Sequence, residues 1–266
     1  MIKKMIHEWV TLWTGKRFWF SLCLTSILFA VFTDYYYRQY PDEDILFYLM
    51  MADMDAPAVA VLSAAAFAYS CVYCQESRQK VRDYVMIRTG LKQYVWVRTL
   101  MGFLSGFMVF FLGKMLFIFL GSWKLPLVIN GGSGYRQSTA EAWGLRNLLL
   151  HGNNVLYFVW MAAVQGMKAG IISLGAQVLS LFVNEPLVII GFPMMFNYLV
   201  YNYLDTILKV PARISWLCIY DPTNRCCKND ITQLLYTSAY TGCLLLLLGC
   251  FSYIRIKRKI YGKKNQ

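Results

Sequence analysis

Long apolar runs dominate this chain, and strictly alternating polar and apolar positions are not its main pattern. A helix that crosses a bilayer needs roughly 20 mostly apolar residues, because the hydrocarbon core is about 30 Å thick and each residue adds about 1.5 Å. The pattern predicts an all-α, polytopic membrane protein in which residues 1–266 form a single domain. Six runs each predict a membrane-spanning helix: Phe18–Phe32, Ala56–Cys74, Thr99–Leu120, Val155–Val183, Pro186–Leu204 and Ile231–Tyr253.

Three of these runs depart from a simple crossing. The first is short unless Thr33–Tyr37 extends it as a belt of interfacial aromatic residues. The fourth is longer than a straight crossing requires, so its helix is expected to tilt or to protrude. Pro193 interrupts the fifth, and we expect a kink inside the bundle there, because neighbouring helices must satisfy the freed backbone groups.

Residues 1–15 have the pattern of an amphipathic helix. The apolar side chains fall within one sector of the helix and the polar ones on the opposite side, which is typical of a helix lying in the membrane interface. A targeting segment or a helix packed on a partner are the alternatives. The apolar sector holds Ile2, Met5, Ile6, Trp9, Val10, Leu12 and Trp13, and the polar side holds Lys3, Lys4, His7, Glu8, Thr11 and Thr14.

Composition and charge narrow the class of protein. Of the 266 residues, 58% are apolar and only 15% are charged, against about 25% charged in average soluble chains, which excludes an ordinary soluble enzyme. One side of the membrane would carry 16 cations and four acids, so the positive-inside rule predicts a multi-pass protein of the cell membrane with both termini cytoplasmic. The net charge of +12 then faces membrane lipid, and nucleic acid is not expected as a partner. The outer loops are 121–154 and 205–230, and the longest cytoplasmic connection is 75–98.

The outer loops contain two local motifs. Gly131–Gly134 predicts a flexible turn, and Ser138–Glu141 has the form of a capping box ahead of a short surface helix. In the second loop, a disulfide between Cys218 and either Cys226 or Cys227 is compatible with a position outside the cytoplasm.

The connection 75–98 is too polar to enter lipid and contains a short basic helix. Val81, Tyr84 and Val85 share one face of this helix, and Gly90 predicts its end because glycine tolerates the left-handed conformation. A second helix is expected to start directly afterwards and to run into the third span. We interpret the short helix as a coupling helix that passes force from a cytoplasmic partner into the membrane. A solvated topology anchor is the alternative.

The sequence lacks the motifs of common membrane enzymes. His7 and His151 are the only histidines, and neither lies beside a second metal ligand. The His-Glu-x-x-His, Gly-x-Ser-x-Gly and Walker patterns are all missing from the sequence. We therefore expect no metal, no cofactor and no catalysis by this chain.

Lysines and small residues mark the interior of the spans. Lys168 lies near the middle of its span with Gln165 close by, and an intramembrane lysine by default indicates a water-lined path or a buried partner. These two are therefore candidate pathway residues. Lys114 lies in the outer half of its span and is expected to reach outward to the interface. Close helix packing is predicted at Gly102, Gly106, Gly166 and Gly170.

Taken together, the six spans, the interfacial helix and the basic loop resemble the plan of ABC transporter permeases of the type-2 exporter class. The closest local match is the segment 76–98, where an acid, a helix, a glycine turn, a basic-x-Tyr-Val step and a cation follow in the family's order. A second match is the tight inner turn 179–186, followed by Pro193. The matching residues of the loop are Glu76, Gly90, Lys92, Tyr94, Val95 and Arg98.

The resemblance implies a division of labour between subunits. A separate ATP-binding subunit would hydrolyse ATP, and a second permease subunit, identical or paralogous, would complete the path. The loop helix would dock in a groove of the ATP-binding subunit. The residues assigned to this contact are Glu76, Arg78, Arg82, Tyr84, Arg88, Gly90, Lys92 and Tyr94.

Two other classes of protein stay open. A membrane-embedded enzyme, such as a maturation protease, would show activity with this chain alone. A sensory or immunity protein would bind a ligand without transporting it and would function without any ATPase. No span indicates the substrate of an exporter, so peptide, antibiotic, lipid and glycan all fit.

Overall fold

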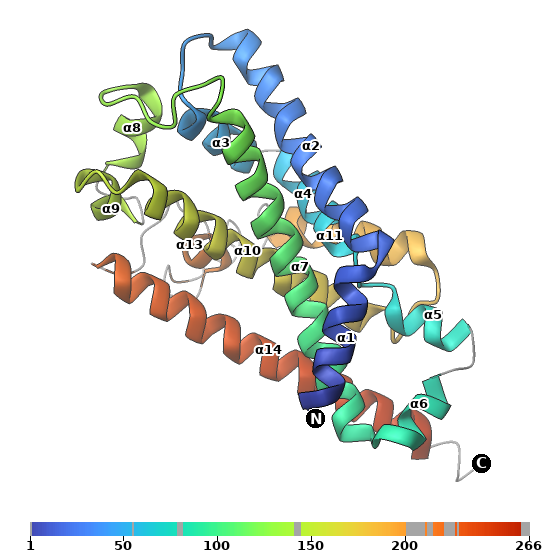
Figure 1. Cartoon of the computed structure of the whole chain (residues 1–266). Coiled ribbons are helices and arrows are strands. Elements are labelled where there is room, and N and C mark those ends of the chain that lie inside the picture. Colours follow the sequence, from blue (N-terminus) through green and yellow to red (C-terminus); the bar gives the residue numbers. More distant parts are fainter. Residues whose placement is uncertain are drawn as a thin grey trace.

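The computed structural model describes residues 2–54, 56–78, 82–140, 145–200, 211, 215–220, 227 and 229–261. Every regular element in these ranges is a helix (Figure 1). The helices are α1 (Ile2–Thr14), α2 (Lys16–Gln39), α3 (Ile45–Met54), α4 (Ala56–Phe67), α5 (Val72–Arg78), α6 (Arg82–Thr89), α7 (Leu91–Gly121), α8 (Ser133–Ser138), α9 (Arg146–Leu150), α10 (Asn154–Leu179), α11 (Pro186–Leu199), α13 (Trp216–Tyr220) and α14 (Asp230–Tyr261).

Five stretches of the described chain are long and apolar enough to cross a membrane. They are α2, residues Ala58–Glu76 of α4 and α5, α7, α10 and α14. The chain is therefore an all-α polytopic membrane protein, as the sequence predicts. α2 continues to Gln39, so Thr33–Tyr37 does extend the first span. α11 is apolar but covers only 14 residues, and residues 201–204 of the predicted fifth span lie outside the described ranges.

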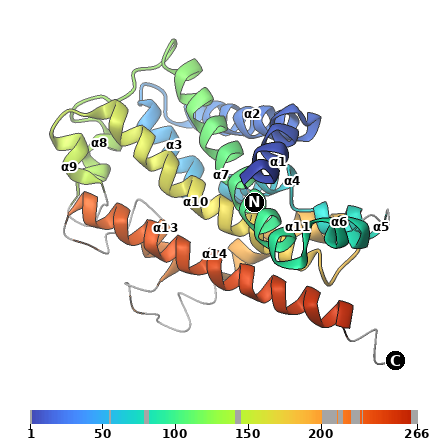
Figure 2. The same ribbon diagram turned by 60° about the horizontal axis from the view of Figure 1, so that its bottom comes forward.

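The helices run between two ends of the bundle. α1, α6 and the last turns of α14 lie at one end, called the α6 end, whereas α3, α8 and α9 lie at the other, the α8 end (Figures 1 and 2). The turn after α10 belongs to the α6 end, because Arg78 Nη2 donates to the carbonyl oxygen of Asn184 at 2.7 Å. α14 starts at the α8 end, where Asp230 accepts the backbone N–H of Leu148 at 3.2 Å. α11 starts directly after this turn, at the α6 end, and the chain is at the α8 end again where α14 starts.

α7 and α10 approach each other closely through glycines. A Cβ atom on Gly106 would lie 2.5 Å from the Cβ of Ser173. From the opposite helix, a Cβ atom on Gly170 would lie 2.9 Å from the carbonyl oxygen of Phe103. Such distances leave no room for a side chain, so the two backbones pack directly on each other. The glycines of this contact, the glycine seam, are Gly102, Gly106, Gly166 and Gly170.

α3 is a buried helix that the sequence did not predict. It packs against α2, α4 and α8 and is too short to cross a membrane. Asp44 holds its start, since Oδ1 accepts the backbone N–H of Phe47 at 2.7 Å and Oδ2 accepts that of Ile129 at 2.8 Å. Burial raises the pKa of the Asp44 carboxyl, and the two N–H donors only partly offset this effect.

The α8 end corrects two predictions about the first outer loop. Gly131–Gly134 is more than a flexible turn, because Gly134 belongs to α8 and a Cβ there would lie 2.8 Å from the backbone nitrogen of Phe47. Ser138 ends α8 and donates its hydroxyl to a methionine sulfur of α3, so it does not cap a following helix. Glu141 lies outside the described residues. The expected short helix is α9.

Of the predicted second outer loop, 205–230, the structure describes α13 and a few single residues. Tyr220 fixes α13 to α14 through a hydrogen bond of 2.8 Å between its hydroxyl and that of Thr241. Cys218 is a free thiol, so the pairing with Cys227 is wrong, and Cys226 lies outside the described residues.

The glycine seam predicts a large effect of added volume. Gly106→Leu should lower the free energy of unfolding by about 1–3 kcal/mol, because Ser173 and the backbone of α10 occupy the space of the new side chain. Thermal unfolding of the purified protein in detergent measures this. Gly242→Leu in α14 is the matched control, since no atom lies within 4 Å of a Cβ there. An equal loss in both variants would contradict the packing role of the seam.

The buried Asp44 carboxyl predicts a pH dependence. Because its pKa is raised in the folded state, protonation favours folding. Relative to Asp44→Asn, the wild type should therefore gain stability as the pH falls from neutral through the folded-state pKa, and the gain should level off below the ordinary carboxyl pKa of about 3.9. Denaturation of both proteins over a pH series gives the difference. A difference that does not change with pH would contradict the shift.

Candidate functional site

The break between α6 and α7 lies at Gly90, as the sequence predicts. α6 ends at Thr89, and Gly90 follows with φ of +76° and ψ of +139°, a positive-φ conformation that glycine adopts at little steric cost because it has no Cβ. The Gly90 N–H donates to the carbonyl oxygen of Met86 at 2.9 Å, and α7 starts at Leu91. One residue therefore separates α6 from α7, a membrane-crossing helix of 31 residues.

α6 is attached to the bundle by a small apolar core of its own. Met86 of α6 is buried in this core, whose other members come from α5, from the start of α7, from the turn after α10 and from the end of α14. α6 itself packs on α5 and α7, and the core continues from there to the turn after α10 and to α14. The buried residues of this core are Tyr73, Met86, Tyr94, Val95, Leu181 and Ile256.

Beside this core, Arg98 of α7 pairs with acids from two other helices. Its Nη1 lies 2.6 Å from Glu8 Oε2 of α1 and donates to the hydroxyl of Tyr69 at 2.6 Å, while Nη2 pairs with Glu76 Oε1 of α5. The Tyr94 hydroxyl donates to the other oxygen of Glu76. The side chains of Arg98 and Glu76 are each only 12% exposed. These five residues are called the Arg98 network.

The Arg98 network joins four helices. It connects α1, α5 and α7 through side chains, and Gln177 of α10 donates to the carbonyl oxygen of Arg98 at 3.2 Å. Ion pairs of this kind hold geometry strongly, because losing one partner leaves a poorly solvated charge and costs about 3–5 kcal/mol. The sequence showed Arg98 as the cation that opens the third span and Glu8 on the polar side of α1, but no pattern predicted that the two would pair.

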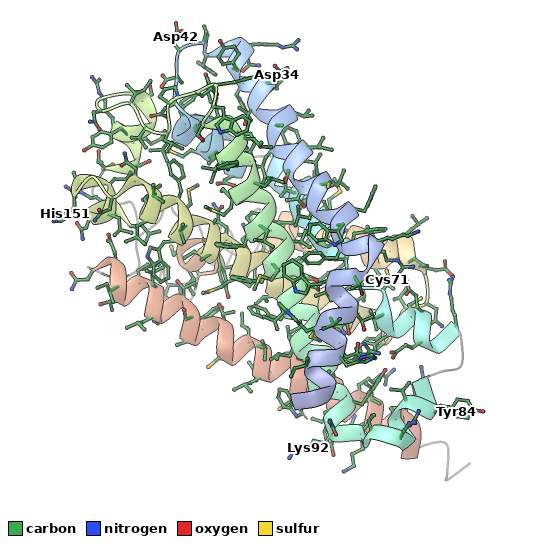
Figure 3. All side chains as sticks on the ribbon, in the orientation of Figure 1. Asp34, Asp42, Cys71, Tyr84, Lys92 and His151 are labelled. Atoms are coloured by element: carbon green, nitrogen blue, oxygen red, sulfur yellow. The ribbon has the colours of Figure 1, made fainter. Side chains whose placement is uncertain are left out.

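The candidate coupling residues divide into an exposed and a buried set. Tyr84 is 75% exposed and points away from the bundle, and Lys92 also lies on the surface (Figure 3). Tyr94 is fully buried, so it is not available for direct contact with a partner, and Glu76 is largely buried inside the Arg98 network. The side chain of Arg82 lies outside the described residues. The exposed candidates are Arg78, Tyr84, Arg88, Gly90 and Lys92.

A second charged cluster lies inside the bundle toward the α8 end. Lys114 of α7 is fully buried, with its Nζ 2.6 Å from Asp53 Oδ2 of α3 and bonded to Gln165 Oε1 of α10. Gln165 Nε2 donates to the same Asp53 oxygen at 2.8 Å, which closes a triangle. The expectation that Lys114 reaches outward is wrong, because Asp53 supplies a buried counter-ion and the rings of Phe29 and Phe110 surround the ammonium.

Lys168 lies next to this cluster. It is half-buried and lines a small cavity together with Asp53, Gln165 and Tyr220. The cavity volume of about 20 Å³ is enough for one water molecule. The two candidate pathway residues, Gln165 and Lys168, are therefore neighbours in a polar site of the bundle interior.

The described residues give no indication of a metal site, since no three His, Cys, Asp or Glu side chains among them lie close enough to hold an ion. Comparison of the chain with known protein families, with curated proteins and with solved structures found no match. The residues of the two clusters are thus the basis for a functional interpretation.

The buried ion pair predicts a strong asymmetry between single and double variants. Lys114→Met should lower the free energy of unfolding by about 3–5 kcal/mol, because Asp53 then keeps a charge without its counter-ion. Adding Asp53→Asn should restore much of the loss, since the amide is neutral and can still bond to Gln165. Thermal unfolding in detergent compares the wild type, Lys114→Met, Asp53→Asn and the double variant. Additive losses in the double variant would contradict the pairing.

Proposed function

We propose that this chain is the membrane-spanning permease subunit of an ATP-driven exporter in the cell membrane. A separate ATP-binding subunit supplies the energy, and two permease subunits, identical or paralogous, form the path. The α6 end, with α1 and the last turns of α14, faces the cytoplasm, where the positive-inside rule puts its lysines and arginines.

The observation that carries this proposal is the connection of an exposed helix to several spans. α6 presents Tyr84 and Arg88 outward, while Met86 on its other side is packed against the bundle. A displacement of α6 is passed to α7 through Gly90 and to α5, α10 and α14 through the small core. The Arg98 network adds α1 to the same unit. This is the construction that a coupling element requires, because a partner can shift a packed bundle only through contacts that differ between its states.

The buried polar site supports a path through the interior. Lys114, Asp53 and Gln165 come from three different elements, and Lys168 lies beside them. Charged groups inside a membrane are costly, and in the spans of transport proteins they mark paths and gates. Any rearrangement of α3, α7 and α10 that separates the triangle would expose these groups to a cavity between the spans.

The docking of α6 can be tested by charge reversal. The affinity-tagged wild type, purified from its native membranes in mild detergent, should carry an ATP-binding protein with it. Arg88→Glu should reduce the amount of that protein about tenfold, because the reversed charge meets a groove suited to a basic helix. Mass spectrometry of the purified complex and its ATPase rate provide the measurement.

Arg258→Glu is the matched control. Arg258 is an exposed cation at the same end of the bundle, but it lies on α14 and not on α6. Equal retention of the ATP-binding protein by both variants would exclude α6 as the docking element. If the wild type carries no ATP-binding protein and functions without one, a sensory or immunity protein becomes the better interpretation.

A further inference from the structure

The α6 end contains a hollow of about 550 Å³ between α1, the start of α2 and the turn that leads from α4 into α5. Its volume lies in the range of small-molecule sites. Part of the wall is polar and includes His7, Lys16 and Arg17, and part is apolar and includes Leu12 and Val72. Glu8 and Arg98 also line it, so the hollow, called the α1–α2 pocket, adjoins the Arg98 network.

The pocket carries uncompensated positive charge. Arg98 is paired with two acids, Glu8 and Glu76, so these three groups carry one surplus negative charge, and Lys16 and Arg17 bring the formal total to +1. Lys16 and Arg17 are exposed, and neither forms an ion pair with another residue in the described ranges. Glu8, the acid that lines the pocket, is already paired with Arg98. The two cations Lys16 and Arg17 therefore favour an anionic ligand.

The depth of the pocket is that of the membrane interface. α2 is the first membrane-crossing helix, and the pocket lies at its first turn. Trp19 of α2 donates its indole N–H to the carbonyl oxygen of Trp13 at 2.7 Å, and Trp13 packs on Phe18 with ring centroids 4.9 Å apart. Tryptophans gather at the headgroup level of a bilayer, because their rings are apolar and their N–H is polar.

We infer that the α1–α2 pocket binds an anionic phospholipid. Its headgroup phosphate lies between Lys16 and Arg17, and the start of an acyl chain follows the apolar wall at Leu12, Phe18 and Val72. A free phosphate would leave the apolar wall unused, and a zwitterionic lipid would leave the two cations uncompensated. The inference does not depend on the proposed exporter function, since it rests on the pocket and the membrane fold alone.

Native mass spectrometry of the full chain in detergent tests this site. Titration with phosphatidylglycerol and with phosphatidylcholine of the same acyl chains should show preferential binding of phosphatidylglycerol. Each cation near the headgroups is worth about fivefold in affinity. Loss of both in the double variant K16Q/R17Q should therefore lower the affinity for phosphatidylglycerol about 30-fold. K257Q/R258Q removes the same charge from exposed positions of α14 at the same end and should change the affinity less than threefold.

Two further measurements separate the lipid from other causes of a loss. Val72→Trp fills the apolar wall without changing charge and should weaken phosphatidylglycerol binding about tenfold, whereas glycerol phosphate should not displace the lipid. The added lipid should also raise the melting temperature of the wild type more than that of K16Q/R17Q. Equal losses in K16Q/R17Q and K257Q/R258Q, equal binding of both lipids, or displacement by glycerol phosphate would overturn the assignment.

Discussion

The structure depends on one constraint, which is that cations inside an apolar bundle must be paired with acids from other helices. α7 carries such a cation toward each of its ends, Arg98 and Lys114, about 24 Å apart along the helix at about 1.5 Å per residue. Arg98 is paired with acids of α1 and α5, and Lys114 with an acid of α3. Short elements that could not hold themselves in a membrane are thereby fixed to the central span. The counter-ions determine where α1 and α3 lie.

The glycine seam makes both pairings possible. Because α7 and α10 touch backbone to backbone, the side chains of α10 reach across to α7 at two levels. Gln177 donates to the carbonyl oxygen of Arg98, and Gln165 bonds to Lys114. A larger residue at Gly102, where a Cβ would lie 1.8 Å from the Gln177 side-chain oxygen, would displace the first of these contacts. The close packing and the polar clusters are therefore parts of one arrangement.

Features that depend on the length and period of apolar runs could be predicted from the sequence. Contacts between residues far apart in the sequence could not. The apolar runs predicted the helical membrane fold, and Gly90 predicted the break between α6 and α7. α3 was not predicted, because its apolar run is too short for a membrane span and shows no amphipathic pattern. The prediction that Lys114 reaches outward is wrong for a related reason. Its counter-ion Asp53 belongs to α3, the helix that the sequence does not predict. Ser138 fitted a capping pattern, but contacts with α3 decided its role.

Two interactions compete for the orientation of α1: its apolar sector favours lipid, and Glu8 pairs with Arg98 inside the bundle. A helix held only by the interface would turn its whole apolar sector toward the bilayer, with Glu8 in water. In the structure, the Glu8–Arg98 pair turns α1 so that Leu12 is buried, while Ile6 and Val10 stay more than half exposed and free for lipid contact. The apolar sector is thus divided between the protein and the membrane. Since Gly15 alone separates α1 from α2, the ion pair sets the angle between them and with it the width of the α1–α2 pocket. A movement of α7 at Arg98 would therefore shift α1 and change the width of the α1–α2 pocket, in addition to changing the packing of the core.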